Sequence, residues 1–266
     1  MNIFNKMNLL VLGALTLSNP LMANNKDGVT YQHNEKLNTI VGQVSAQRIE
    51  QDIKTLVGFG TRHTLSDTKS DTRGIGAARR WIFAEFERIS DACGGCLEVY
   101  YQSAVISGEK RIPDATEVVS VIAVQKGQTD PGRYVIMSGD IDSRASNTMD
   151  FTTNAPGAND NASGMAGTIE AARVLSKYKF ESSIIYVGLS GEEQGLFGGA
   201  GLAKYAKEKG WDIIGVLNND MIGNITGVDG VIDNRTFRIF SEPVPANETA
   251  RQRRARRFYG GEVDGI

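Results

Sequence analysis

The 266-residue sequence has little histidine and little cysteine, with two residues of each type. Two cysteines exclude a scaffold built on many disulfides, and two histidines mean that any metal site must rest mainly on carboxylates. Six prolines and 30 glycines, without a repeat, exclude a collagen-like chain and indicate many tight turns. The chain also lacks a basic excess, with 29 Lys and Arg against 31 Asp and Glu, so we expect no nucleic-acid partner.

The first residues have the pattern of an export signal. Lys6 precedes an apolar run, 9–17, that is too short to span a bilayer, and the small residue Ala23 closes the segment. We interpret residues 1–23 as a signal peptide, with a buried N-terminal helix as the alternative, and residues 24–266 as a single domain. No later run is long and apolar enough to cross a membrane, so we expect a secreted or periplasmic protein.

Export also bears on the two cysteines. Cys93 and Cys96 enclose two glycines, a spacing that in the cytosol is typical of redox or metal chemistry. A zinc knuckle needs a second pair of ligands, which the sequence lacks. We therefore predict a local disulfide that ties a turn.

Hydrophobic patterning indicates alternating helices and strands. Apolar residues at helical spacing predict helices after Ser45 and after Thr72. Short apolar runs predict strands at 118–124, 134–137, 184–189 and 213–217, with helices at 164–178 and 196–209 between the last three. This order predicts an α/β fold with a mostly parallel central sheet and helices on both faces.

Acidic residues follow three of these strands and also occupy one glycine-rich loop. They are Asp140 and Asp142, then Glu192 and Glu193, then Asp220, with Asp160 in loop 155–164. Ligands bind outside the carboxyl ends of strands in open α/β sheets, so we expect these side chains at one rim. Crowded carboxylates repel, and a divalent cation relieves the repulsion. Taken singly, each acid could instead be a solvated loop residue or a helix cap.

The adjacent pair Glu192 and Glu193 suggests hydrolysis. Neighbouring side chains after a strand point in different directions, so one can bind a metal while the other faces the attacking water. A general base beside a metal-activated water is the minimal equipment for metal-assisted hydrolysis. A serine hydrolase around Ser190 is a weak alternative, because the G-x-S-x-G pattern and a downstream histidine are both missing.

Four sequence strings carry a family resemblance. SGDIDSR (138–144), APGANDNASG (155–164), SGEEQGLFGG (190–199) and NNDMIG (218–223) resemble the M28 family of co-catalytic zinc aminopeptidases, and GTRH (60–63) extends the likeness more weakly. The resemblance implies a three-layer αβα fold like that of zinc exopeptidases. It also implies two divalent ions, which are usually zinc in this family, and peptide substrates with a free N-terminus that are cleaved one residue at a time.

The resemblance assigns a role to each acid. Asp160 is similar to the carboxylate that bridges both metals, and Glu192 to the general base. Glu193 matches a ligand of one metal and Asp220 a ligand of the other. Asp142 matches the acid that orients the first metal ligand.

Two departures from the family pattern change the expectation. The family usually has His where this chain has Asp140, so Asp140, Asp160 and Asp220 form an all-carboxylate set that should tolerate Mn²⁺, Co²⁺ or Mg²⁺ better. The family also places a final His ligand well downstream of Asp220, whereas His63 is the last His here. We therefore expect a C-terminally truncated chain with an incomplete sheet and doubtful full activity.

Neither of the two histidines is expected to replace the missing ligand. His63 lies in a loop before a predicted helix, where a place at the rim or on the surface is expected, and His33 is expected to be solvated. Loss of ligands makes a second function credible: a non-catalytic, metal-dependent binding domain of the same fold. Oligomeric state and substrate side-chain preference are not encoded in these patterns.

Overall fold

The computed structural model describes residues 34–236, Ile239 and Thr249. The predicted signal peptide, residues 1–23, and His33 lie outside these residues. Within the described part, none of the helices is both long and apolar enough to cross a membrane.

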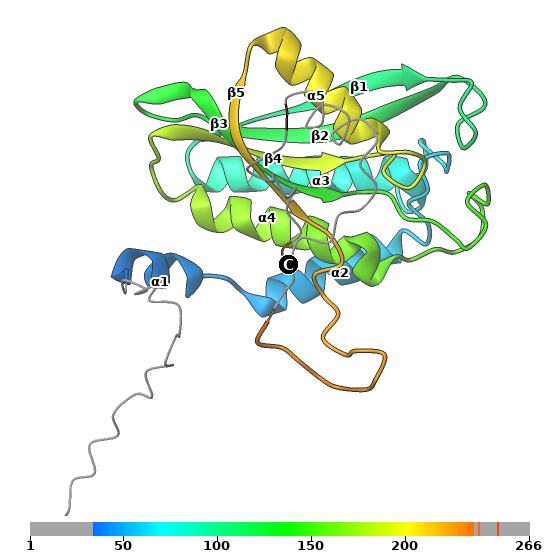
Figure 1. Ribbon diagram of the computed structural model, residues 1–266, viewed down its shortest axis with the longest axis horizontal. Helices are drawn as coiled ribbons and strands as arrows, with labels where there is room; N and C mark the ends of the chain where they lie inside the picture. Colours follow the sequence, from blue (N-terminus) through cyan, green and yellow to red (C-terminus); the bar gives the residue numbers. More distant parts are fainter. Residues whose placement is uncertain (1–33, 237–238, 240–248, 250–266) are drawn as a thin grey trace, which may run out of the picture.

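The centre of the fold is a five-stranded sheet (Figure 1). Its strands are β1 (Leu97–Ile106), β2 (Thr116–Gln125), β3 (Asp130–Asp140), β4 (Ser182–Leu189) and β5 (Asp212–Asn219), in the spatial order β1-β2-β4-β3-β5. β3 pairs in parallel with both β4 and β5, and β2 pairs antiparallel with both β1 and β4.

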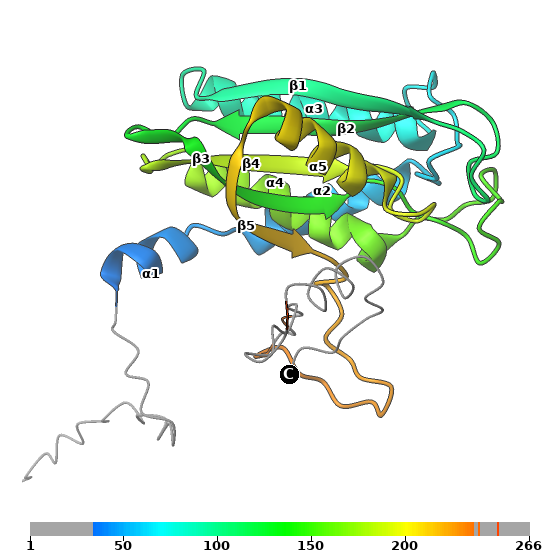
Figure 2. The same cartoon turned by 45° about the horizontal axis from the view of Figure 1, so that its top comes forward.

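Helices cover both faces of this sheet, as predicted. The helices of the described residues are α1 (Glu35–Val41), which buries none of its residues, α2 (Ala46–Gly58), α3 (Gly74–Ala92), α4 (Gly164–Leu175) and α5 (Phe197–Lys209), with a π-helical turn, η1 (Ala158–Ser163), before α4. α3 and α4 pack on one face with α2 behind α4, and α5 packs on the other face over β1 and β2 (Figure 2). Ser45 caps α2 as expected, because its Oγ accepts the Arg48 N–H at 3.3 Å.

The prediction of a mostly parallel sheet needs a correction. The strands that carry the acids, β3, β4 and β5, are parallel, but β1 and β2 make the sheet mixed. Loop 107–115 joins β1 to β2 without a helix, so the two strands pair as neighbours running in opposite directions. β1 was not predicted because its apolar residues are interleaved with polar ones, and four of its ten residues are exposed.

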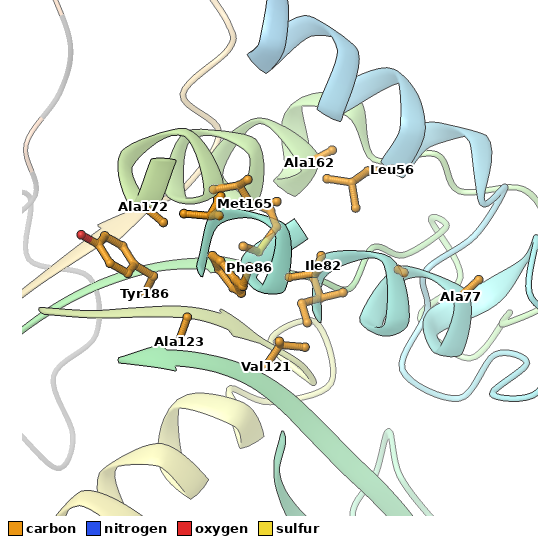
Figure 3. Close-up of a cluster of buried hydrophobic side chains, with 14 of the residues drawn as sticks. Leu56, Ala77, Ile82, Phe86, Val121, Ala123, Ala162, Met165, Ala172 and Tyr186 are labelled. Atoms are coloured by element: carbon orange, nitrogen blue, oxygen red, sulfur yellow. The ribbon is translucent and has the colours of Figure 1, made fainter. Parts of the chain in front are cut away.

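Two hydrophobic clusters hold the layers together. The larger lies between the sheet and α2, α3 and α4, where Phe86 and Ile82 of α3 meet Val121 and Ala123 of β2 (Figure 3). The smaller lies under α5 and consists of Ile122, Val124, Ile136, Ile185, Val187 and Leu202. Each fully buried large apolar side chain contributes about 1.5–3 kcal/mol relative to an exposed one.

The predicted disulfide is present. Cys93 and Cys96 are bonded to each other and close the turn between α3 and β1. Cys93 directly follows α3 and Cys96 directly precedes β1, so the bond holds the end of the helix beside the start of the strand.

Candidate metal-dependent active site

The three parallel strands end at the same edge of the sheet. Asp140, the last residue of β3, pairs with Leu189, the last residue of β4. Gly139 pairs with Asn219, the last residue of β5. Since Glu192 and Asp220 follow these strand ends within three residues, the structure brings the acids after all three strands to one rim.

The loop that carries Asp160 is held against the same rim. Asp160 lies in η1, and Gly164 opens the following helix, α4. A Cβ on Gly164 would lie 2.0 Å from the backbone oxygen of Asn219, so only glycine allows this approach. Glycine is therefore what lets the Asp160 loop reach the end of β5.

Asn161 connects β3, β5 and α4 through one buried side-chain amide. Its Nδ2 donates to Oδ2 of Asp140 at 3.0 Å and to the backbone oxygen of Asn219 at 2.9 Å. Its Oδ1 accepts the backbone N–H groups of Gly164 and Met221 at 3.1 and 3.2 Å. All four bonding directions of the amide are used, so Asn161 fixes the relative positions of these segments.

Asp142 is buried and organises the turn that follows β4. Its Oδ1 accepts the backbone N–H of Glu192 at 3.2 Å, and its Oδ2 accepts that of Glu193 at 3.1 Å. The hydroxyl of Thr64 also donates to Oδ2, at 3.2 Å. The sequence suggested that Asp142 orients a neighbouring ligand; in the structure its partners are the backbone of the Glu192–Glu193 pair and Thr64.

Glu193 has a cationic neighbour that the sequence did not suggest. Nε of Arg144 donates to Oε2 of Glu193 in an ion pair, and the guanidinium of Arg111 donates to the backbone oxygen of Glu193 at 2.6 Å. The Arg144 side chain is 39% exposed, whereas that of Glu193 is 11% exposed. Arg144 can therefore move into solvent, while Glu193 is held in place.

The acids at this rim influence one another electrostatically. Burial raises the pKa of Asp140 to about 8, and the nearby Asp142 carboxylate adds to the rise. Burial and the adjacent Glu193 raise the pKa of Glu192 to about 7. Burial and the Asp160 carboxylate likewise raise the pKa values of both Glu193 and Asp220. Such shifts arise when carboxylates are buried and, to a smaller extent, when like charges share a site.

This donor set suits a divalent cation. Carboxylate oxygens are ligands of hard divalent ions, and a cation would offset both the burial of these charges and the repulsion between them. In residues 34–236, no three His, Cys, Asp or Glu side chains already surround a single ion position. Asp160 and Asp220 are exposed, so their side chains have room to turn toward an ion.

His63 does not supply the missing ligand. It is fully buried, and its Nδ1 accepts the Leu65 N–H at 3.0 Å while its Nε2 lies 3.0 Å from the backbone oxygen of Thr148. Both ring nitrogens are therefore occupied. The expected place at the rim or on the surface is wrong, because His63 is enclosed behind the rim.

Ser190 is not placed as a nucleophile. It is fully buried, and its Oγ donates to the backbone oxygen of Val119 at 2.6 Å. Sequence reasoning missed Asn161 and Arg144, although both lie inside the strings that carry the family resemblance. Their partners are 21 and 49 residues away in sequence, so only the fold reveals the contacts.

Comparison with known proteins identifies the family. Residues 120–236 match Peptidase family M28. A protein named "Probable zinc metalloprotease" from Leptosphaeria maculans is 43% identical over 230 residues, which cover 86% of this chain and 53% of that protein. The chain thus spans about half the length of the curated relatives it matches.

Solved structures show the same fold at low sequence identity. LapA aminopeptidase of Legionella pneumophila has a TM-score of 0.54 and 21% identity, over 73% of this chain and 48% of LapA. A glutaminyl cyclase of Bacteroides thetaiotaomicron has a TM-score of 0.53 and 18% identity, over 70% of this chain and 64% of the cyclase. These structures show the fold, and the family match together with the 43% identical relative shows that the chain belongs to peptidase family M28.

Proposed function

We propose that this chain carries the catalytic face of an exported metallo-aminopeptidase, which releases N-terminal residues from peptides with two divalent ions, preferably zinc. The observation that supports this most is the gathering of Asp140, Glu192 and Asp220 at one sheet edge, with Asp160 raising the pKa values of its neighbours. The name of the 43% identical relative, "Probable zinc metalloprotease", agrees with the choice of metal.

The acids divide into ligands and a base. Asp160 would bridge the two ions, with Asp140 and Asp220 on one and Glu193 on the other. When bound, the ions polarise the scissile carbonyl and lower the pKa of the attacking water. Arg144 must leave Glu193 for that ligand to be free, and its exposure permits the movement.

Glu192 is the proposed general base. Its backbone N–H is fixed by Asp142, and its half-buried carboxylate lies among the other acids. From this place it can take a proton from water and pass it to the leaving amine, a role typically worth about 10²–10⁴-fold in rate. The base therefore acts next to the ligands without being one of them.

An acidic rim also suits a substrate with a free N-terminus, since carboxylates attract the α-ammonium group. LapA, which has the same fold, is named an aminopeptidase. Two further features support export: the pattern of residues 1–23 and the Cys93–Cys96 disulfide, a bond typical of oxidising compartments.

Two observations favour a second candidate, a non-catalytic metal-dependent binding domain. Glu193 is already paired with Arg144, and an aspartate, Asp140, occupies the place where the family usually has histidine. A protein that binds zinc without hydrolysing any peptide would fit this alternative.

The Glu192→Gln variant tests the proposal. We expect hydrolysis of aminoacyl anilides to fall by about 10²–10⁴-fold while the zinc content is unchanged, because only the base is removed. Glu208→Gln, on the exposed face of α5, is the matched control and should keep the full rate. Full activity of Glu192→Gln would refute the assigned base, and zinc binding without turnover in the unmodified chain would favour the binding domain.

A further inference from the structure

We propose that Arg62 and His63 are positioning residues that hold the acid-bearing segments of the rim in register. They belong to segment 61–64, which lies behind the rim and contacts the end of β3, the Asp160 loop and the Glu192–Glu193 turn. The inference rests on the proposed function only where it concerns zinc, because the contacts themselves are independent of any ligand.

Arg62 joins two of the acid-bearing segments. Its Nε donates to the backbone oxygen of Ile141, which lies between Asp140 and Asp142, at 2.8 Å. Its two terminal nitrogens donate to the backbone oxygens of Pro156 and Gly157, at 2.6 and 3.0 Å, just before Asp160.

A fourth bond anchors Arg62 to α2, since Nη1 also donates to the backbone oxygen of Leu56 at 3.0 Å. The side chain is 1% exposed, and none of these four acceptors is charged. A buried guanidinium is costly without compensation, and the nearby carboxylates of Asp142 and Asp160 supply opposite charge. A lysine has one nitrogen and cannot reach acceptors on three segments.

The backbone around Arg62 strengthens this junction. The Arg62 N–H donates to Oγ of Ser143 at 3.1 Å, and that hydroxyl donates to the backbone oxygen of Ala155 at 2.6 Å. The Ala155 N–H donates to the backbone oxygen of Gly60 at 2.8 Å. The segment after β3 and the segment before Asp160 are therefore both fastened to the chain at 60–62.

His63 connects the third acid-bearing segment, the Glu192–Glu193 turn. Because its Nδ1 accepts the Leu65 N–H, the ring hydrogen must be on Nε2, where the backbone oxygen of Thr148 accepts it. The side-chain amide nitrogen of Gln194 lies 3.2 Å from the same Nε2.

Two donors cannot bond to each other, and Oε1 of Gln194 is buried without a hydrogen-bond partner among the described residues. Rotating the Gln194 amide by 180° brings that oxygen to the Nε2–H of His63, which is then shared between Gln194 and the backbone oxygen of Thr148. The ring then holds the residue directly after Glu192 and Glu193. Thr64 adds the hydroxyl bond to Asp142, whose carboxylate fixes the backbone of both glutamates.

Amide hydrogen exchange of the chelator-treated protein tests the inference without any catalytic readout. His63→Asn keeps an acceptor where Nδ1 lies but loses the contacts of Nε2, whereas His63→Gln keeps a polar group where Nε2 lies. We expect exchange of the Glu192 and Glu193 amides to rise about tenfold in His63→Asn and to return toward the unmodified rate in His63→Gln.

Arg62→Lys should act on a different segment. We expect the amides of Ala155 and Ala162 to exchange about tenfold faster, because both donate to backbone oxygens around the Arg62 junction. Ser90→Ala is the matched control: Ser90 is buried and bonded to both the N–H and the oxygen of Leu97, away from the rim. It should destabilise the fold and speed exchange of Leu97 alone.

Zinc affinity, measured by competition with a chelator, is the second readout. His63→Asn and Arg62→Lys should weaken zinc binding about tenfold. Ser90→Ala should leave zinc binding unchanged even when its melting temperature falls as much as those of the two rim variants. If either rim variant fails to fold, Thr64→Val removes only the hydroxyl bond to Asp142 and should speed exchange of the Glu193 amide.

Unchanged exchange at Glu192, Glu193, Ala155 and Ala162 would overturn the inference. So would a control variant with the same effects on the rim. If the unmodified chain binds no zinc, the proposed function fails, but the exchange pattern still decides whether Arg62 and His63 position these segments.

Discussion

Replacing Asn161 with aspartate should separate the acidic segments that its amide now joins. The change is nearly isosteric, but it puts an acceptor oxygen where Nδ2 donates to Asp140 and to the backbone oxygen of Asn219. The two bonds accepted by Oδ1, from Gly164 and Met221, survive. The variant therefore tests the donor half of the amide alone.

The size of the effect depends on pH. Without a cation the pKa of Asp140 is raised to about 8, so near pH 6 its carboxyl keeps a proton that it can share with the introduced carboxylate. The main loss is then the bond to Asn219, about 1 kcal/mol. Near pH 9 the native Asp140 is charged, so the variant loses a hydrogen bond to a charged group and sets a second carboxylate against it, which adds about 1.5–3 kcal/mol. We expect unfolding free energy to fall by about 3 kcal/mol at pH 9.

Urea unfolding of the chelator-treated protein at both pH values measures this effect. Asn159→Asp is the matched control in the same loop, since Oδ1 of Asn159 accepts the Gly223 N–H at 2.9 Å and aspartate retains that acceptor. Its effect should be small at both pH values. An Asn161→Asp variant as stable as the unmodified protein at pH 9 would refute the view that Asn161 joins these segments.

Asp140→His provides an internal check. An imidazole N–H can donate to a carboxylate, so Asn161→Asp should cost less in the Asp140→His background than in the native one. Equal costs in the two backgrounds would show that residues 140 and 161 do not interact.

Two further changes probe charges in and beyond the rim. Asp52 is buried on α2, and burial raises its pKa from 3.8 to about 6, so the folded state binds a proton that the unfolded state releases. The stability of the fold should therefore fall as the pH rises from about 4 to about 6. Asp52→Asn should flatten that fall, which thermal unfolding measured across this pH range would show. Arg144→Gln removes the cation paired with Glu193, so zinc affinity measured by calorimetry should rise a few-fold, whereas Arg144→Lys should keep the native value.

Much of the fold follows from local pattern. The apolar stripe after Thr72 predicted α3, and its residues Ile75, Ile82 and Phe86 do enter the larger core cluster. Four apolar runs predicted β2 to β5. β2 and β4 are mostly buried, as continuously apolar strands usually are, whereas no residue of β5 is buried in the structure. The short helix α1 and the strand β1 carry weaker patterns, and the antiparallel pairing of β1 and β2 depends on how distant strands meet.

The site was partly predictable for a similar reason. Parallel strands end at a common edge, so the order of strands and acids already placed Asp140, Glu192 and Asp220 together. The roles of Arg62 and Asn161 could not be foreseen, since Arg62 reaches residues 79 to 95 positions away and Asn161 reaches one 58 positions away. Burial of His63 was unexpected because an isolated loop histidine gives no sign of its surroundings.

Zinc titration of the metal-free chain by calorimetry, beside Asp160→Asn, tests most directly whether the gathered acids form a metal site. We expect the unmodified chain to bind two zinc ions, and to bind manganese as well because its ligands are carboxylates. Asp160→Asn should weaken both zinc sites, since Asp160 is the proposed bridge. Zinc uptake that is absent in the unmodified chain, or identical in the variant, would contradict the account.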